Sequence, residues 1–434
     1  MPWIDSFHPR RFGPPGFHNK LFGIRELDGT AADIYRVLPT YRRISQKYNA
    51  LMQPEWRPDL PGRTEQDRTD KVIRLVKRGV NGYSLLDWSF MTAADANLQA
   101  SRTGNNIPNR GASSWGVLGM GHPEELPRWE ADPRENTAII KRMGYFFGAD
   151  QVGIATLDRR WVYSHYFVKK TGAEIPIRFS DEPGYEHIDR PVELEDGTQV
   201  IPKEMKYVIV FIHEMNRDGI SMAPTLFAHA TTRTTYSKIA FITASMAEFL
   251  RGLGYNAIAS ANETALNTPL AIDAGLGQLS RQAKLINPTY GPRCRISKVF
   301  TDMPLFPDRP IDFGVTRFCN TCLKCAHACP RHCIPTGPPS YEPKGDYSHD
   351  AVLQWQMDHM KCREYFTAVG TNCGLCLVAC PYNKPPHWGQ WFTASLIATT
   401  PLFNSFILWM DDRLGYGKRK NASEFWTKIR SGKL

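Results

Sequence analysis

Two cysteine runs near the C-terminal end carry the clearest chemistry in this sequence. The first has the spacing C-x2-C-x2-C-x3-C-P over residues 319–330, and the second has C-x2-C-x3-C-P over residues 373–381. The first run matches the bacterial motif that binds [4Fe-4S] clusters, in which three thiolates hold one cluster and the fourth cysteine reaches a neighbouring cluster. The second run lacks the first cysteine of that motif, and Cys362, eleven positions before Cys373, can replace it.

The crossover of ligands between neighbouring clusters assigns eight of the ten cysteines. It predicts one [4Fe-4S] cluster on Cys319, Cys322, Cys325 and Cys380, and a second on Cys329, Cys362, Cys373 and Cys376. Clusters that exchange ligands in this way lie close together, which suits electron transfer between them. Two zinc sites built from the C-x2-C pairs would leave both C-P endings unexplained, so we disfavour them. The pairing assigns neither Cys294 nor Cys333 to a cluster, and we expect both to be buried spacers instead of ligands.

A further centre is needed, because clusters of this kind pass electrons singly and break no substrate bond alone. The sequence has no convincing nucleotide site: residues 252–254 and 275–277 hold two glycines each, without the third glycine and the acidic residue of a dinucleotide-binding motif. We interpret them as helix-end and packing glycines. His213 and Glu214 do not form a zinc-protease motif, since the residue four positions after His213 is Arg217.

The composition is that of a large folded protein. The 434 residues are 42% hydrophobic and 22% charged, which excludes disorder as the main character. The longest strongly apolar run, residues 207–212, is far shorter than the roughly 18 residues that a membrane span requires. The net charge of +10 includes no run of five or six basic residues, so we favour a solvated basic surface over a site for nucleic acid or an acidic partner.

The middle of the chain has the patterns of an α/β domain. Asp132 and Pro133 mark a helix start, and apolar residues recur at helical spacing until Gly148, before a short strand at 152–155. A second helical stripe at 239–253 precedes a strand at 255–259. Residues 207–212 are apolar on both faces, which predicts a central strand. The first 130 residues are irregular, with one expected helix at 66–76.

From residue 236 to residue 381 the sequence resembles the corrinoid-dependent reductive dehalogenases, especially the respiratory tetrachloroethene type. The landmarks are both cysteine runs and the segments at residues 254–258, 274–278, 298–305 and 310–316. Weaker similarity at 148–164 and 410–417 extends the resemblance to about the last 300 residues, whereas the first 130 match weakly.

The resemblance implies a fold and two kinds of cofactor. It implies a nitroreductase-like α/β core that binds a corrinoid, followed by a bacterial ferredoxin-like module with two [4Fe-4S] clusters. The expected division is an N-terminal wrapping segment at 1–130 that contributes to the corrinoid and substrate pocket, the core at 131–310, the two-cluster domain at 311–386, and a segment at 387–434 that packs back on the core. The corrinoid is expected base-off, with no His ligand to cobalt, in keeping with the lack of an Asp-x-His-x-x-Gly motif.

The resemblance also assigns site residues. The family's proton-donating tyrosine falls on Tyr236, its asparagine on Asn262 and its arginine on Arg295. A phenol is a weak acid at neutral pH, and a guanidinium beside it stabilises the phenolate and makes the proton transferable. The alternatives are an ordinary helix-start tyrosine, a turn asparagine and a surface strand arginine. Aromatic residues expected to line the substrate pocket are Trp388, Trp115 and Trp88, of which the last two are weaker candidates.

The function that the resemblance implies is reductive dehalogenation in organohalide respiration, in which a carbon–halogen bond is replaced by carbon–hydrogen. An epoxyqueuosine reductase, which acts on tRNA, is the main enzyme alternative, and the basic charge favours it slightly. A non-catalytic electron carrier would leave most of the chain before residue 310 without a purpose.

Partners and location follow from the resemblance alone. Expected partners are a small organohalide, an upstream electron donor and a small integral membrane anchor protein, with a homodimer as the expected assembly and no nucleic acid. The expected location is the outer face of the cytoplasmic membrane after removal of a twin-arginine signal, with a cytoplasmic variant as the alternative. Arg10 and Arg11 are followed by a turn-forming segment instead of an apolar one, so an export signal is either lacking or removed.

Overall fold

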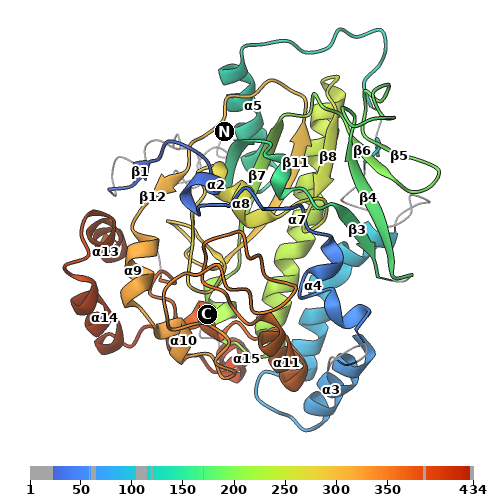
Figure 1. Ribbon diagram of the computed structural model, residues 1–434. Helices are drawn as coiled ribbons and strands as arrows, with labels where there is room; N and C mark the ends of the chain where they lie inside the picture. The colour runs from blue at the N-terminus through green and yellow to red at the C-terminus, as the bar shows by residue number, and fades with distance from the viewer. Residues whose placement is uncertain are drawn as a thin grey trace, which may run out of the picture.

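The computed structural model of this protein describes residues 23–57, 59, 65–103, 115–118, 121–169, 171–384 and 388–430, which form a mixed arrangement of helices and sheets (Figure 1). Its central sheet has the order β2-β7-β11-β8, and every neighbouring pair is antiparallel. The strands are β2 (Gln151–Thr156), β7 (Tyr207–Glu214), β11 (Cys294–Thr301) and β8 (Ala257–Ser260). The prediction of a central strand at 207–212 is confirmed, because β7 lies between two strands and is buried along that stretch.

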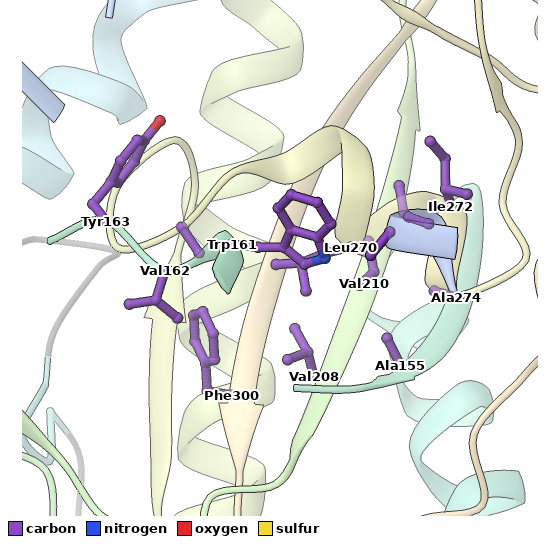
Figure 2. Packing of buried hydrophobic residues seen from close by; sticks show 14 of the residues in the cluster. Ala155, Trp161, Val162, Tyr163, Val208, Val210, Leu270, Ile272, Ala274 and Phe300 are labelled. Atoms are coloured by element: carbon purple, nitrogen blue, oxygen red, sulfur yellow. The ribbon is translucent and has the colours of Figure 1, made fainter. Parts of the chain in front are cut away.

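Alternate residues of the central strands enter two different hydrophobic cores. On one face, Val208 and Val210 of β7 and Phe300 of β11 pack with Trp161 and with α8 (Asn267–Asp273), as Figure 2 shows. On the other face, Ile209, Phe211 and Val299 pack against helices α5 (Pro133–Phe146) and α7 (Leu226–Gly252). The sheet is therefore covered by helices on both faces.

The long helix α7 differs from its expected extent. The apolar stripe predicts a helix at 239–253, whereas α7 begins thirteen residues earlier, at Leu226. Its first half is rich in threonine, a β-branched residue of lower helix propensity. Four of these threonines donate their hydroxyls to the carbonyl four residues earlier: Thr231, Thr232, Thr234 and Thr235.

The N-terminal part contains more helix than expected. The predicted helix at 66–76 is confirmed as α3 (Glu65–Lys77), but α4 (Leu85–Thr103) has no counterpart in the expectation. Figure 1 shows α4 running beside α7, and this tertiary contact explains a helix whose sequence has only weak periodicity. The remaining elements of this part are β1 (Arg25–Glu26), α2 (Ala31–Ile34), η2 (Gln46–Tyr48) and η3 (Gln53–Glu55).

Other expected boundaries hold within a few residues. Asp132 caps α5, because its side chain accepts a hydrogen bond from the Arg134 backbone. The strand expected at 255–259 begins two residues later, since Asn256 donates its backbone N–H to Asp302 instead of to a neighbouring strand. Between these parts, η5 (Arg159–Trp161) precedes a second sheet of order β3-β4-β6-β5, with β3 (His165–Val168), β4 (Ala173–Phe179), β5 (Val192–Glu193) and β6 (Gln199–Ile201).

The cysteine-rich part consists of short helices and loops. Its start is joined to the N-terminal part by the pair β1 and β12 (Ile311–Asp312), and a small hairpin, β9 (Gln278–Leu279) and β10 (Leu285–Ile286), lies just before it in the chain. The helices from this part to the end of the described chain are α9 (Val315–Thr321), α10 (Lys324–His327), α11 (His359–Val369), α12 (Leu375–Ala379), α13 (Trp388–Thr399), α14 (Asn404–Arg413) and α15 (Ala422–Arg430). One more short helix, α6 (Arg217–Ser221), lies between β7 and α7 in the chain. Among the described residues, none of the helices combines the length and apolar character needed to cross a bilayer.

Candidate active site

The eight cysteines expected to hold clusters lie close enough together to perturb one another's pKa values. Around Cys380, burial raises the pKa of the thiol far above its usual value, and the charges of Cys325, Cys319 and Cys322 raise it further. Because such charge effects act over short distances, these four thiols lie near one another. They come from α9, from the loop after it, from α10 and from the end of α12.

The second group surrounds Cys373. Burial raises the pKa of the Cys373 thiol to about 12, with further contributions from the charges of Cys376, Cys362 and Cys329. The two groups are close to each other, since Cys376 also raises the pKa of Cys325. Thiols bind iron as thiolates, so burial of this kind favours the protonated thiol until a cluster binds. A collection of thiols of this kind is compatible with two [4Fe-4S] clusters, and the assignment of each cysteine to one cluster stays a prediction.

The two cysteines outside the pairing differ in position. Cys333 is buried, and its Sγ lies 3.1 Å from Sγ of Cys329, so it adjoins the second group. Cys294 begins β11, and its thiol contacts the carbonyl of Gly291 at 3.7 Å. Cys333 is buried as expected and touches an expected ligand, whereas Cys294 is only half-buried, which differs from the expectation of a buried residue.

Basic side chains lie beside both thiol groups. Arg281, 1% exposed, donates to the carbonyl of Cys319 through Nε and Nη2 at 3.0 and 2.8 Å, and its Nη1 donates to Pro335 and Gly337. The hydrogen bond with Cys333 and then the charge of Lys284 lower the pKa of Cys362, whereas the charge of Lys284 only partly offsets the rise that burial causes in the pKa of Cys376. These cations offset the negative charge that collected thiolates would carry.

The structure brings Tyr236, Asn262 and Arg295 together from three elements. Asn262 donates from Nδ2 to the Tyr236 hydroxyl at 3.2 Å, and Cζ of Arg295 lies 5.3 Å from the centroid of the Tyr236 ring. Tyr236 is on α7, Asn262 is two residues past the end of β8, and Arg295 is on β11. The pairing of β8 with β11 brings the loop after β8 alongside the start of β11, and α7 crosses that end of the sheet.

The positions of Tyr236 and Arg295 do not fit the ordinary alternatives considered for them. Tyr236 lies eleven positions into α7, so the interpretation as a helix-start tyrosine is wrong. Arg295 is half-buried, and its Nε is fully enclosed without a hydrogen-bond partner among the described residues, so it is no ordinary surface residue. Asn262 does lie in a turn, and its side chain nonetheless points to Tyr236.

The three tryptophans expected around the substrate do not form one group in the described part of the chain. Trp115 belongs to the large core cluster on the α8 face of the sheet, and Trp88 packs with Val72, Tyr83 and Leu226. Trp388 is the first residue of α13, but its side chain lies outside the residues described.

Two further polar residues that the sequence reasoning missed reach this site. Lys298, on β11, donates to Oδ1 of Asn267 at 2.7 Å, and Asn267 donates from Nδ2 to Oδ1 of Asn262 at 3.1 Å. The available signal was a lysine in the middle of a strand whose neighbours Val299 and Phe300 are buried and apolar. Such a residue requires polar partners.

Four buried polar atoms of residues close in the chain to Arg295 or to the site around Cys319 and Cys380 have no hydrogen-bond partner among the described residues. They are Oε1 of Gln282, Nε of Arg293, Nε of Arg295 and Oδ1 of Asn383. Gln282 adjoins Arg281, and Asn383 donates its backbone N–H to the carbonyl of Cys380, so both lie close to the first thiol group. An unpaired buried polar atom costs about 1–3 kcal/mol. A corrinoid, which carries amide side chains around its ring, fits such a set of unmatched donors and acceptors.

Comparisons with known proteins agree with these features. Residues 71–305 match the family model described as the reductive dehalogenase subunit. A tetrachloroethene reductive dehalogenase of Sulfurospirillum multivorans is 36% identical over 385 residues, which cover 82% of this chain and 75% of that protein. One from Desulfitobacterium hafniense is 33% identical over 68% of this chain and 57% of its own length.

The solved structures agree on the fold. A variant of the catabolic reductive dehalogenase NpRdhA superposes with a TM-score of 0.68 at 23% identity, covering 95% of this chain and 51% of that one. The chain thus spans between about half and three quarters of these relatives. An epoxyqueuosine reductase of Lactococcus garvieae matches only 27% of this chain, at 28% identity over 119 residues.

Proposed function

Because this chain belongs to the reductive dehalogenase family, as its resemblance predicted, we propose that it replaces a carbon–halogen bond of a small organohalide by carbon–hydrogen. The reaction takes the organohalide, two electrons and one proton to the hydrodehalogenated product and a halide ion. One observation carries the proposal: a tyrosine held between an amide donor and a guanidinium, in a family member whose cysteine runs predict two [4Fe-4S] clusters.

We assign the proton to Tyr236. Its hydroxyl oxygen accepts a hydrogen bond from Asn262, which stabilises the phenolate that remains once the proton has left. Arg295 stabilises the same negative charge from beside the ring. A phenol between two such groups is placed to act as a general acid.

The cofactors in this proposal are a base-off corrinoid and two [4Fe-4S] clusters. Bound corrinoid supplies a cobalt centre that can take up electrons and react with a carbon–halogen bond. The eight cysteines of the two groups would hold the clusters, and the unmatched polar atoms of Gln282, Arg293 and Asn383 are the groups that we assign to the corrinoid side chains. We further propose that the core is nitroreductase-like and the cysteine-rich part ferredoxin-like, with the boundaries 1–130, 131–310, 311–386 and 387–434.

Substrate, partners and location also remain proposals. The substrate class that we propose is a chlorinated ethene, because the relatives at 36% and 33% identity are named as tetrachloroethene reductive dehalogenases. An aromatic pocket that includes Trp388 would suit such an apolar molecule. The proposal includes an upstream electron donor, a small membrane anchor protein at the outer face of the membrane, and a homodimer.

Reconstitution tests the proposed function. The chain is loaded anaerobically with corrinoid, iron and sulfide, reduced strongly, and offered chlorinated ethenes, ethanes and aromatics, with halide release as the measurement. A parallel reaction offers epoxyqueuosine in tRNA. We expect halide from at least one organohalide and no change in the tRNA; turnover of the tRNA without halide would establish the alternative.

A further inference from the structure

Lys298 is a charged group enclosed in the core on the α8 face of the central sheet. It is fully buried, and its Nζ donates to the carbonyls of Ala261 and Glu263, each at 3.0 Å, and to Oδ1 of Asn267 at 2.7 Å. An ammonium group has three N–H donors and no acceptor. The three acceptors therefore match the three donors of a charged lysine, although burial lowers the pKa of Lys298 to about 7.

This ammonium fixes the orientation of the Asn267 side chain. The oxygen and nitrogen of an amide have nearly the same shape, so only the partners decide which way it points. In its charged form Lys298 can only donate, so the atom of Asn267 that faces the ammonium must be the oxygen. The nitrogen is then turned to three oxygens, at 2.9 Å in Ala261, 3.1 Å in Ile296 and 3.1 Å in Asn262.

The same reasoning fixes Asn262. Its side-chain oxygen faces the Asn267 nitrogen, which leaves the Asn262 nitrogen to face the Tyr236 hydroxyl at 3.2 Å. The tyrosine oxygen is thus an acceptor in this contact, and its own proton points elsewhere. The network passes around the end of the edge strand β8, from Lys298 on one face of the sheet to Tyr236 on the helix of the other face.

The loop that carries Asn262 is held by its own contacts. The Glu263 carboxylate accepts the backbone N–H groups of Ala261 and Asn262 at 3.1 and 3.0 Å, and Ser260 donates its hydroxyl to the Glu263 carbonyl at 2.5 Å. These contacts hold the loop backbone together with the bonds that Asn267 donates to the carbonyls of Ala261 and Ile296. Asn267 also sets the direction of the Asn262 amide.

We propose that Lys298 and Asn267 are positioning residues that hold the Asn262 amide with its N–H toward Tyr236, so that the tyrosine proton stays available for transfer. This inference rests on the proposed function of Tyr236 as the proton donor. With the amide reversed, the Asn262 oxygen would accept the tyrosine proton and withdraw it from the substrate.

Two substitutions of Asn267 separate positioning from mere structural support. Asn267→Asp keeps the shape and gives Lys298 an ionic partner, but it removes the N–H that faces Asn262, so the Asn262 amide reverses. Asn267→Ala removes the partner altogether, so the Asn262 amide samples both orientations. We expect kcat for halide release to fall at least about tenfold in Asn267→Asp and less in Asn267→Ala, with KM within about twofold of wild type in both.

Asn136→Asp is the matched control. Asn136 is fully buried, its amide donates to the carbonyls of Ala131 and Pro304 at 3.2 and 3.0 Å, and none of its hydrogen bonds within the described part of the chain reaches the Tyr236 network. Asn136→Asp loses a buried N–H as Asn267→Asp does, and we expect its kcat per bound cobalt to equal that of the wild type. All variants are compared at equal iron and cobalt content, so that a folding defect is seen as lost cofactor.

A double variant tests whether Asn267 acts through Asn262. In an Asn262→Ala background, we expect Asn267→Asp to lower kcat no further. The inference is overturned if Asn267→Asp turns over at the wild-type rate, if it is milder than Asn267→Ala, or if its effect persists in full without Asn262. Failure of wild-type protein to release halide would instead contradict the proposed function.

Discussion

Removing the charge of Arg295 measures how much that residue contributes to proton delivery. Its guanidinium carbon lies 5.3 Å from the centroid of the Tyr236 ring. Two unit charges at that distance interact by about 3 kcal/mol at an effective dielectric constant of about 20. Because Arg295 is only half-buried, solvent reduces this value, and about 1.5–3 kcal/mol is a fair range. We therefore expect Arg295→Met to lower kcat by about 10- to 100-fold.

Steady-state halide release under excess reductant is the assay, with rates expressed per bound cobalt. Arg295→Lys keeps the positive charge and should retain a larger part of the rate than Arg295→Met. Arg134→Met serves as a matched control, since Arg134 also lies over an aromatic ring, with Cζ 3.6 Å from the Phe306 centroid, but belongs to α5. A fully loaded Arg295→Met enzyme whose kcat stays within twofold of wild type would refute the role of this charge.

Three further predictions follow from the site and the core. Tyr236→Phe should keep iron and cobalt but lose at least about 100-fold in kcat, whereas unchanged turnover would remove Tyr236 from the acid role. The cysteine pairing is tested by the iron content of two double variants. Cys319→Ser/Cys380→Ser removes two ligands of one predicted cluster and should keep about four irons per chain, whereas Cys376→Ser/Cys380→Ser removes one ligand of each cluster and should keep almost none. Equal iron contents in the two variants would contradict the pairing. Burial lowers the pKa of His213 to about 3, whereas the imidazole has its ordinary pKa of about 6.5 in the unfolded chain. Below pH 6.5 the unfolded chain therefore binds a proton that the folded protein does not, and lowering the pH from 7.5 to 5.5 should reduce the free energy of unfolding by about 1.4 kcal/mol. His213→Asn should show a smaller acid shift of the melting temperature, and an identical shift would argue against a neutral buried His213.

The cysteine sets and the central strand could be predicted from the sequence because each is encoded locally. Ligand spacing within a few residues defines the two runs, and an unbroken apolar stretch defines β7. The start of α7 could not be predicted in the same way, since threonine has a low helix propensity and its hydroxyl finds a carbonyl partner only once the helix has formed. Helix α4 depends on its contact with α7, which no local pattern encodes.

The candidate site was predictable only in part for the same reason. Tyr236, Asn262 and Arg295 follow from a family resemblance, but their contact depends on a helix, a loop and a strand that meet at one end of the sheet. Lys298 and Asn267 are 31 positions apart in the sequence, and their hydrogen bond forms only when α8 covers β11. A lysine inside an apolar strand signals that partners exist, without identifying them.

Turnover in deuterium oxide tests the central claim most directly. The reconstituted protein is supplied with two-electron equivalents of reductant and a chlorinated ethene, and both halide and product are quantified. We predict one halide per product molecule and one solvent-derived deuterium at the carbon that lost the halogen, because the Tyr236 hydroxyl exchanges with solvent. No halide from protein fully loaded with corrinoid and clusters, or halide with product that lacks deuterium, would contradict the account.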